Sequence, residues 1–214
     1  MRILRLPGVF APRSDTWMLA EHLRGHPRVR GAVLDVCTGS GALAVSAALA
    51  AARSVTAVDV SRRALATAQL NARLNGVRVR TRRGHLLDAV PGETFDLIVS
   101  NPPYLPSPAA LPTRGTARHT EAGPHGRTLL DRLIAQAPQH LAPGGALLVT
   151  HSSVNDEQRT LDRMRDAGLE PEVLERRRGP LGPLLAARAP EMERAGLLDP
   201  GVREEDILVV AGTG

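Results

Sequence analysis

The segment SNPPYLP, residues 100–106, combines a primary amide with a stiff backbone at the end of an apolar run. Pro102 lacks a backbone donor and fixes its own φ, and Pro103 keeps Pro102 out of the helical region. Asn101 Oδ1 and the Pro102 carbonyl could therefore accept both N–H groups of one planar amino group, while Tyr104 packs against it. Two such acceptors would align the nitrogen and stabilise positive charge that develops on it. The alternative is a rigid turn that only caps a strand.

A glycine-rich turn, Gly39-Ser40-Gly41, follows the apolar segment 31–37. Glycines adopt backbone angles that other residues avoid, and they let a ligand approach the backbone closely. Asp59 ends the next apolar segment, at a position where a carboxylate could bind ribose hydroxyls. A G-x-G turn between a predicted strand and a predicted helix, with such an acidic residue, is typical of sites for nucleoside-containing cofactors.

Asp35 helps to choose between the two cofactors that this pattern fits, NAD and S-adenosylmethionine. It lies near the end of the first predicted strand, where a dinucleotide would place its pyrophosphate. A carboxylate there would repel phosphate, but it would attract the ammonium group of a methionine moiety. The residues therefore favour S-adenosylmethionine. An NAD enzyme, and an Asp35 that only caps the loop, remain the alternatives.

Strand-like and helix-like segments that could position these residues alternate from residue 32 onward. We predict strands at 31–37, 54–60, 77–83, 95–100, 144–152, 169–177 and 204–212. We predict helices at 40–52, 61–76, 126–141 and 155–168, with Ser61 as an N-cap and an interruption near Pro138. Such alternation predicts an α/β fold with a parallel sheet covered on both faces, and ligands bind beyond the carboxyl ends of its strands.

Size and charge limit the possible functions. The chain has 214 residues, which suits one α/β domain over 1–214. Its formal net charge is +5, its pI is about 10.9, and all 27 basic residues are arginine because lysine is absent. Only 78–83 and 175–179 concentrate arginine, so we interpret the charge mainly as solvated surface, with nucleic acid as the alternative partner. Aromatic residues make up 2%, which disfavours a base-stacking platform.

Other features bear on location and on metals. No apolar run approaches the roughly 20 residues of a membrane span, and no secretory signal is apparent, so we expect a cytoplasmic protein without membrane contact. The single cysteine, Cys37, excludes an internal disulfide and a Cys-based zinc site, and we interpret it as a packed residue. His119, His125, His140 and His151 lack a metal-ligand spacing, so we expect no metal.

The motifs DVCTGSGALA (35–44), VDVS (58–61) and NPPY (101–104), in this order, resemble those of class I S-adenosylmethionine-dependent methyltransferases. NPPY is similar to the motif of the branch that methylates amino groups. The stretches 9–23 and 121–149 further resemble the HemK type, the release-factor glutamine methyltransferases. The resemblance covers most of residues 8–177.

This resemblance implies a doubly wound, Rossmann-like, seven-stranded and mostly parallel sheet whose last strand is antiparallel. It implies that Asn101 lies at the cofactor as well as the acceptor, that Asp15 and Thr16 approach the cofactor's methionine end, and that Asp59 holds the ribose. The N-terminal segment, residues 1–30, would pack on the cofactor site. The chain resembles the short form without an N-terminal helical domain, which in some lineages works with a small partner subunit; a homodimer is the alternative.

One position departs from the family pattern. Many relatives have Gly-Asp-Leu after the third strand, whereas this chain has Gly84-His85-Leu86. The acidic group that often accepts a hydrogen bond from the adenine amine is therefore missing. We expect His85 to accept through a ring nitrogen, or Asp88 to substitute.

We therefore expect an N-methyltransferase that acts on a glutamine side chain of a protein, such as a release factor. The alternatives are an exocyclic amine of adenine or guanine in RNA or DNA, a lysine, a peptide or small-molecule amine, and a cofactor-binding partner without catalysis. The long loop 105–123 is predicted to form the acceptor channel and to order on substrate binding. The insert 179–201 reads as one or two short helices, a lid or docking element or only a decoration.

Overall fold

The computed structural model describes residues 1–107 and 122–214. Its centre is a seven-stranded sheet of order β3-β2-β1-β4-β5-β7-β6. The strands are β1 Ala32–Val36, β2 Ser54–Asp59, β3 Arg80–Arg83, β4 Phe95–Ser100, β5 Leu141–Ser152, β6 Glu170–Pro180 and β7 Glu204–Thr213. Strand β7 pairs antiparallel with both β5 and β6, and the other pairs are parallel. The predicted α/β sheet with an antiparallel last strand is confirmed.

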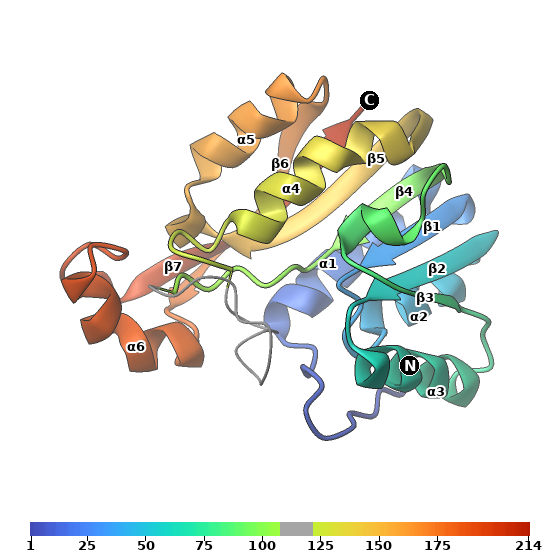
Figure 1. The fold of residues 1–214 in the computed structure, drawn as a ribbon, viewed down its shortest axis with the longest axis horizontal. Helices are drawn as coiled ribbons and strands as arrows, with labels where there is room; N and C mark the ends of the chain where they lie inside the picture. Colours follow the sequence, from blue (N-terminus) through green and yellow to red (C-terminus); the bar gives the residue numbers. More distant parts are fainter. Residues whose placement is uncertain (108–121) are drawn as a thin grey trace.

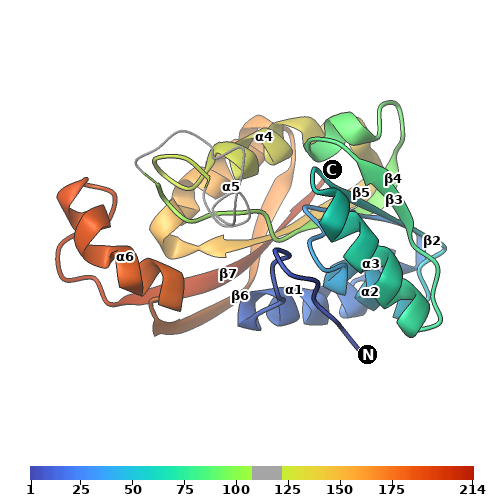
Figure 2. The same ribbon diagram turned by 60° about the horizontal axis from the view of Figure 1, so that its bottom comes forward.

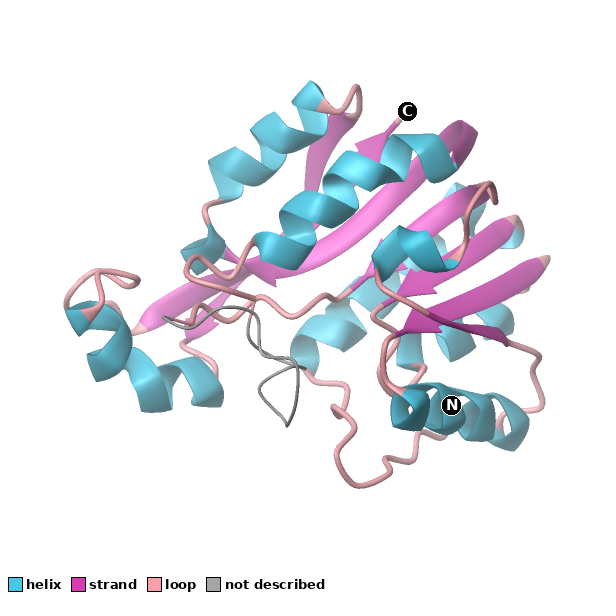
Figure 3. Ribbon diagram, viewed as in Figure 1, coloured by secondary structure: helices cyan, strands magenta, loops and turns pink. Residues whose placement is uncertain are grey.

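Helices alternate with the strands along the chain and cover both faces of the sheet (Figures 1 and 3). The α-helices are α1 Ser14–Gly25, α2 Ala42–Leu49, α3 Arg62–Leu74, α4 Thr128–Gln136, α5 Glu157–Asp166 and α6 Pro183–Arg194. Short 3-10 helices are η1 Pro27–Arg30, η2 Leu86–Ala89, η4 Ala137–His140 and η5 Ser153–Asn155. Figure 2 shows α1, α2 and α3 on one side of the sheet and α4 and α5 on the other.

Two buried clusters, one on each face, hold these layers together. Because successive side chains of a strand point to opposite faces, Leu34 of β1 joins the cluster under α4 and α5, whereas Val33 joins the cluster under α1 and α2. Helix α4 contributes Leu133 to the first cluster, and α1 contributes Leu19 to the second; all four side chains have no exposed surface. Burying an aliphatic side chain of this size stabilises the fold by about 1.5–3 kcal/mol.

Element boundaries differ from the predictions where pairing depends on distant residues. Strand β3 pairs with β2 only from Arg80, so it is shorter than the predicted 77–83. Strand β5 begins at Leu141, which pairs with Phe95 before a bulge shifts the register. Helix α4 gives way to η4 at Ala137, one residue before Pro138, so the predicted interruption is confirmed.

Strand order reverses between β1 and β4, because β2 and β3 follow on one side of β1 and β5 follows on the other side of β4. The two strands are in register, with Val36 opposite Ser100. Ser100 Oγ donates to the Val36 carbonyl oxygen at 2.7 Å. The turn after β1 and the loop after β4 therefore leave the sheet side by side, at the edge where such folds bind ligands. Within the described ranges, no helix has the length and apolar character of a membrane span.

Candidate active site

Asn101 follows β4 directly, and its side-chain amide is held by helix α1. Its Nδ2 donates to Asp15 Oδ2 and to Thr16 Oγ1, at 3.0 Å in each case. Both partners are acceptors for this group, so the network fixes which end of the amide is nitrogen. Asn101 Oδ1 has no partner in these contacts and remains available as an acceptor.

Asp15 is the centre of this arrangement and has only 6% of its surface exposed. Its Oδ1 accepts from the Thr16 backbone N–H at 2.7 Å, and its Oδ2 also accepts from the Tyr104 hydroxyl at 2.9 Å. Burial, together with the charge of Asp15, raises the pKa of Tyr104 well above its ordinary value. Tyr104 therefore keeps its proton and acts as a donor to Asp15.

A pocket opens over the Asn-Pro-Pro-Tyr segment. Asn101, Pro102 and Tyr104 line it, together with Asp15. These four residues therefore border one cavity, and the roles predicted for them from the sequence stay predictions. The hydroxyl of Tyr104 donates to Asp15. Packing of the Tyr104 ring against an acceptor stays a prediction.

The C-terminal part of the chain also lines the pocket. Leu184 and Leu185 of α6 and Glu205 of β7 line it. Glu205 Oε1 accepts from the Gly182 backbone N–H at 2.6 Å, which anchors the start of α6. Leu185 belongs to a small buried cluster that also contacts Leu105, just after Tyr104. The predicted helical insert is thus a single α-helix that packs beside the candidate acceptor pocket.

Asp35 lies fully buried near the end of β1. Its Oδ2 accepts from Thr38 Oγ1 at 2.5 Å and from the Ala44 backbone N–H at 3.0 Å, so the capping role considered from the sequence is present. Its Oδ1 is also buried but has no hydrogen-bond partner. Burial raises the pKa of Asp35 to about 7. An unpaired buried carboxylate oxygen is costly, and a cationic ligand would relieve that cost.

Asp59 organises the turn after β1. Its Oδ2 accepts from the Gly39 backbone N–H at 3.0 Å, and its Oδ1 accepts from the Ser61 backbone N–H at 2.8 Å. Gly39 has a φ of +53°, and a Cβ added there would meet no atom closer than 4.0 Å. The turn therefore presents open space beside an acidic residue, as a bound nucleoside would require.

Gly41 has a different local reason for being glycine. Its φ is +81°, and a Cβ there would lie 2.7 Å from the Cα of Ala68 on helix α3. The absence of a side chain lets the start of α2 pack against α3. Contact between Gly41 and a cofactor stays a prediction, because packing alone explains this residue.

The N-terminal segment contacts the same turn. Asn71 of α3 is fully buried, and its Nδ2 donates to the carbonyl oxygens of Leu4 and Ser40 at 2.9 and 2.8 Å. Asn71 Oδ1 accepts in return from the Leu4 backbone N–H at 2.8 Å. One side chain therefore links the first residues of the chain to the glycine-rich turn.

His85 and Asp88 were the two candidates for the missing acidic contact. His85 Nδ1 is buried without a hydrogen-bond partner. Asp88 is exposed, and its two oxygens accept from Arg132 and Gln136 of α4, at 2.6 Å each. The structure thus leaves His85 with an unused ring nitrogen, whereas Asp88 is engaged elsewhere.

These observations fit a cofactor with an ammonium group and a nucleoside. Asp35 Oδ1 and His85 Nδ1 are buried polar atoms without a protein partner, and Gly39 leaves room beside Asp59. Cys37, in the same turn, has a thiol whose pKa is raised by burial and by the charges of Asp59 and Asp35. A thiol held in its protonated form is a poor nucleophile, which agrees with a packing role.

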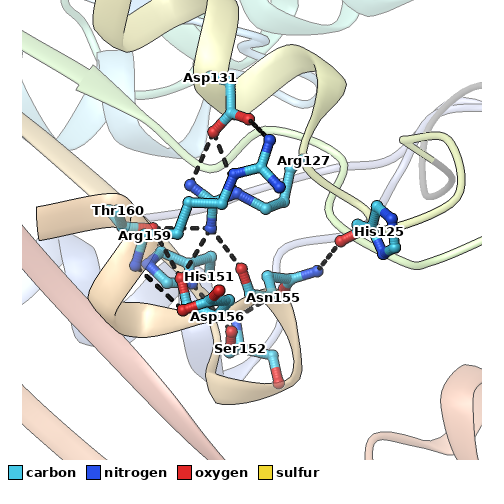
Figure 4. Close-up of polar contacts among 9 residues, drawn as sticks. All are labelled: His125, Arg127, Asp131, His151, Ser152, Asn155, Asp156, Arg159 and Thr160. Atoms are coloured by element: carbon cyan, nitrogen blue, oxygen red, sulfur yellow. Dashed lines mark hydrogen bonds and ion pairs between the residues drawn. The ribbon is translucent and has the colours of Figure 1, made fainter. Parts of the chain in front are cut away.

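Sequence reasoning did not single out Arg127, Asn155 or Glu205. Arg127 and Asn155 belong to one buried hydrogen-bond network (Figure 4). Asn155 Nδ2 also donates to the Tyr104 carbonyl oxygen. No local pattern marks them, since their contacts join segments far apart in the chain. The predicted acceptor channel at 105–123 falls mostly on residues 108–121, which lie outside the described residues.

The sequence profile of the methyltransferase small domain family matches residues 1–170. A release factor glutamine methyltransferase of Bordetella pertussis is 42% identical over 183 residues, which cover 80% of this chain and 66% of that protein. A protein of Methanocaldococcus jannaschii, whose name proposes N5-glutamine methylation of proteins, is 29% identical over 86% of this chain and 92% of its own length. The chain spans less than two thirds of several curated relatives, for example 60% of the release factor glutamine methyltransferase of Deinococcus radiodurans.

Solved structures show the same fold. The Mtq2-Trm112 complex of E. cuniculi, described as responsible for methylation of the eRF1 translation termination factor, matches with a TM-score of 0.67 and 22% identity, over 96% of this chain and 98% of that chain. The T. thermophilus 16S rRNA N2 G1207 methyltransferase RsmC, solved with AdoMet and guanosine, matches with a TM-score of 0.64 and 18% identity. That match covers 98% of this chain and 46% of the other.

Proposed function

Because the chain belongs to the methyltransferase small domain family, we propose that it is an S-adenosylmethionine-dependent N-methyltransferase that modifies a glutamine side-chain amide of a protein. The observation that carries this proposal is the orientation of Asn101. Its nitrogen is bound by Asp15 and Thr16, which leaves its oxygen available as an acceptor, and both Asn101 and Pro102 line the pocket. That arrangement offers acceptors, and a primary amide offers two N–H donors.

Four residues would hold the cofactor. Asp35 Oδ1 would bind the ammonium of the methionine moiety, Gly39 would allow close approach, Asp59 would accept from the ribose, and His85 Nδ1 would accept from the adenine amine. When bound, S-adenosylmethionine supplies a methyl group on a positively charged sulfur. Thr16 was also predicted to bind the cofactor. Its hydroxyl oxygen accepts from Asn101 Nδ2, so we assign it to the orientation of Asn101 instead.

Residues of this chain would compensate for the low nucleophilicity of the proposed acceptor. An amide nitrogen is a poor nucleophile because its lone pair is delocalised into the carbonyl. Asn101 Oδ1 and the Pro102 carbonyl would accept its two N–H groups, which fixes the nitrogen and favours positive charge on it. Asp15 keeps the Asn101 amide in the orientation that presents oxygen, and the two prolines keep the backbone from relaxing away.

The names of the relatives support a protein substrate. Release factor and ribosomal protein uL3 glutamine methyltransferases are both among them. We take a release factor as the first candidate acceptor. A small partner subunit forms part of the proposal, because one protein of the same fold was solved as the Mtq2-Trm112 complex. The mass of the purified protein in solution, alone and from a lysate, distinguishes a partner subunit from a homodimer.

A transfer assay tests the proposed function. The enzyme is incubated with methyl-labelled S-adenosylmethionine and a recombinant bacterial release factor, and in parallel with a lysate separated into protein, RNA and small molecules. We expect label in protein, on glutamine by peptide mass spectrometry. Label confined to RNA or to small molecules would overturn the proposed acceptor.

The variant Asn101→Ala tests the role of the amide. We expect turnover to fall by about 10²–10³-fold, the usual loss for one electrostatic contact in a transition state, with cofactor affinity retained in calorimetry. Asn75→Ala is the matched control, because Asn75 lies at the end of α3 and bonds only to backbone carbonyls and the Arg2 N–H. Equal turnover in the two variants would refute the role assigned to Asn101.

A further inference from the structure

A buried arginine, Arg127, is the centre of a hydrogen-bond network that joins the start of α4 to the segment after β5 (Figure 4). Arg127, with 3% of its surface exposed, donates through Nη1 to the carbonyl oxygens of Asn155 and Asp156 and to Thr160 Oγ1. Its Nε and Nη2 donate to Asp131 Oδ1 at 3.0 and 2.7 Å. Every nitrogen of the guanidinium is therefore used, and the segment that follows β5 is tied to the start of α4.

Asn155 connects this arrangement to the Asn-Pro-Pro-Tyr segment. Its side chain is 1% exposed, and its Nδ2 donates to the Tyr104 carbonyl oxygen at 2.6 Å and to the His125 carbonyl oxygen at 3.1 Å. Its Oδ1 accepts from the Ser152 backbone N–H at 3.3 Å. Both ends of this amide are thus engaged, and its orientation is fixed as that of Asn101 is.

The backbone of Gly126 lies against the hydrogen bond between Asn155 and Tyr104. Gly126 has a φ of +66°, and a Cβ there would overlap the Tyr104 carbonyl oxygen and Asn155 Nδ2. The backbone at 126 therefore passes directly against the Tyr104 carbonyl. Nearby, the Ala122 N–H donates to the Leu105 carbonyl oxygen at 3.0 Å. This second bond also holds the segment around Gly126 close to the segment around Tyr104.

Tyr104 is consequently held at two points by two different parts of the chain. Asp15 of α1 binds its hydroxyl, and Asn155 of η5 binds its carbonyl. We propose that Asn155, itself held by Arg127, is a positioning residue for methyl transfer, because it fixes the backbone direction that places the Pro102 carbonyl at the acceptor. This inference rests on the proposed function and names further residues of the same site.

The composition of the network favours positioning over simple stability. A buried guanidinium is expensive to desolvate, and apolar residues would stabilise this region at least as well. Arg127 has a single carboxylate partner, Asp131, which also accepts from Arg159 at 3.0 Å. Arg127 offers several directed donors at once, so it specifies one geometry of the 155–156 backbone. That geometry is the one from which Asn155 reaches Tyr104.

The first test changes Asn155. Asn155→Asp keeps the size but replaces the donor by an oxygen that faces the Tyr104 carbonyl, and Asn155→Ala removes the contact. We expect kcat to fall by about tenfold or more in each, since slight misplacement of reacting groups costs up to about 10²-fold. The KM for S-adenosylmethionine should stay unchanged, because the network contacts the acceptor side only. A merely structural Asn155 would change the melting temperature but would leave kcat at 25 °C unaltered.

A second pair of variants disturbs the same contact without touching Asn155. Gly126→Ala places a methyl group against the Tyr104 carbonyl, whereas Gly168→Ala carries a similar backbone cost at φ +79° with open space around it. Gly168 lies between α5 and β6, away from the pocket. We expect both to lower the melting temperature, but only Gly126→Ala to lower kcat.

The two proposals can fail separately. Wild-type protein is first assayed with the recombinant release factor, and cofactor binding is measured by calorimetry. No cofactor binding, or no methylated protein from wild type, contradicts the proposed function. An active wild type whose Asn155→Asp, Asn155→Ala and Gly126→Ala forms keep full kcat contradicts the positioning role alone. A soluble variant with lower kcat and unchanged cofactor KM supports it.

Discussion

The hydroxyl of Tyr104 donates to Asp15 Oδ2 at 2.9 Å, across 89 residues of sequence. The same oxygen also accepts from Asn101 Nδ2 at 3.0 Å. One buried carboxylate oxygen thus determines both the hydroxyl direction of Tyr104 and the amide orientation of Asn101. The N-terminal helix is therefore part of the candidate acceptor site, although it precedes the sheet in the chain.

Asp15→Asn tests this shared carboxylate. The variant keeps the size of the side chain but brings an amide nitrogen toward the donors of Asn101 and Tyr104, so the Asn101 amide should lose its fixed orientation. We expect kcat for protein methylation to fall by about 10- to 100-fold. Steady-state assays with the recombinant release factor measure this change, and calorimetry measures cofactor affinity.

Tyr104→Phe provides the comparison, because it removes one of the two bonds to Asp15 Oδ2 and leaves Asn101 in place. We expect a smaller loss of kcat than in Asp15→Asn. The double variant should lose less than the product of the single losses, since both changes act on one carboxylate. Independent, multiplying losses would show that Asp15 and Tyr104 act separately.

Cofactor binding should depend on pH through Asp35. Burial raises the pKa of Asp35 to about 7, so part of the population is protonated at neutral pH. Only the ionised form attracts an ammonium. We expect affinity for S-adenosylmethionine to rise by about 25-fold from pH of about 5.5 to pH of about 7.5, in proportion to the ionised fraction of Asp35, as measured by calorimetry. Asp35→Asn should bind more weakly, with a flatter profile; identical profiles would exclude Asp35 as the ammonium contact.

The same shift predicts the stability of the cofactor-free protein. An acid whose folded pKa lies above its unfolded value destabilises the fold when it ionises. This contribution to the free energy of unfolding should decline as pH rises from 3.8 toward about 7. Urea titrations of wild type and Asp35→Asn isolate the effect as a difference. Saturating S-adenosylmethionine should reduce it, because the ligand favours the ionised form.

Two glycines of one turn should respond differently to alanine. Gly41→Ala brings a Cβ within 2.7 Å of Ala68 on α3 and adds the cost of a positive φ, so we expect a loss of about 2 kcal/mol or more in unfolding free energy. Gly39→Ala meets no close atom and should cost about 1 kcal/mol, but should weaken cofactor binding more than it weakens the fold. Urea unfolding and calorimetry on both variants decide this; cofactor affinity reduced equally with stability in each would contradict it.

His151 should weaken the fold in acid. It is fully buried and bonds to the Ser152 carbonyl oxygen through Nδ1, while Nε2 has no partner. Burial lowers the pKa of His151 to about 4, with a smaller contribution from the charge of Arg127. The hydrogen bond to the Ser152 carbonyl and the charges of Glu157 and Asp131 act in the opposite sense. Between pH 6.5 and about 4 the unfolded chain binds a proton that the folded chain does not, so stability falls as pH falls.

The size of the His151 effect follows from the shift. A difference of about 2.5 pKa units corresponds to roughly 3 kcal/mol. We expect His151→Gln to be less dependent on pH in this window, as measured by urea midpoints at several pH values. The comparison with wild type removes the opposing contribution of Asp35, which both proteins share. Parallel pH profiles would show that His151 does not titrate in this way.

Features with local signals could be predicted from the sequence. Strand β4, Phe95–Ser100, has the predicted bounds because its apolar run has clear ends. Ser61 was predicted as an N-cap, and its Oγ accepts from the Ala64 N–H at 3.3 Å. The order of β1, α2, β2 and β4 along the chain was enough to place Gly39 and Asn101 at one edge of the sheet, since parallel strands end together.

Contacts between distant segments could not be predicted in this way. Asp15 and Thr16 were expected at the methionine end of the cofactor, yet the structure adds their bonds to Asn101, which depend on how α1 packs against α2 and β5. Arg127 and Asn155 meet only once α4 and η5 are packed together. An arginine in a helix-like run normally reads as a surface charge, and only its burial reveals another role.

The placement of β7 has a consequence for how the chain folds. It is inserted between β5 and β6, two strands that precede it, so neither of them has this neighbour until residues 204–213 arrive. An intermediate without β7 would expose an open hydrogen-bonding edge on β5, the kind of surface on which aggregation starts. It would also lack Glu205 and the anchor of α6, so the candidate acceptor pocket would be incomplete until the last strand is in place.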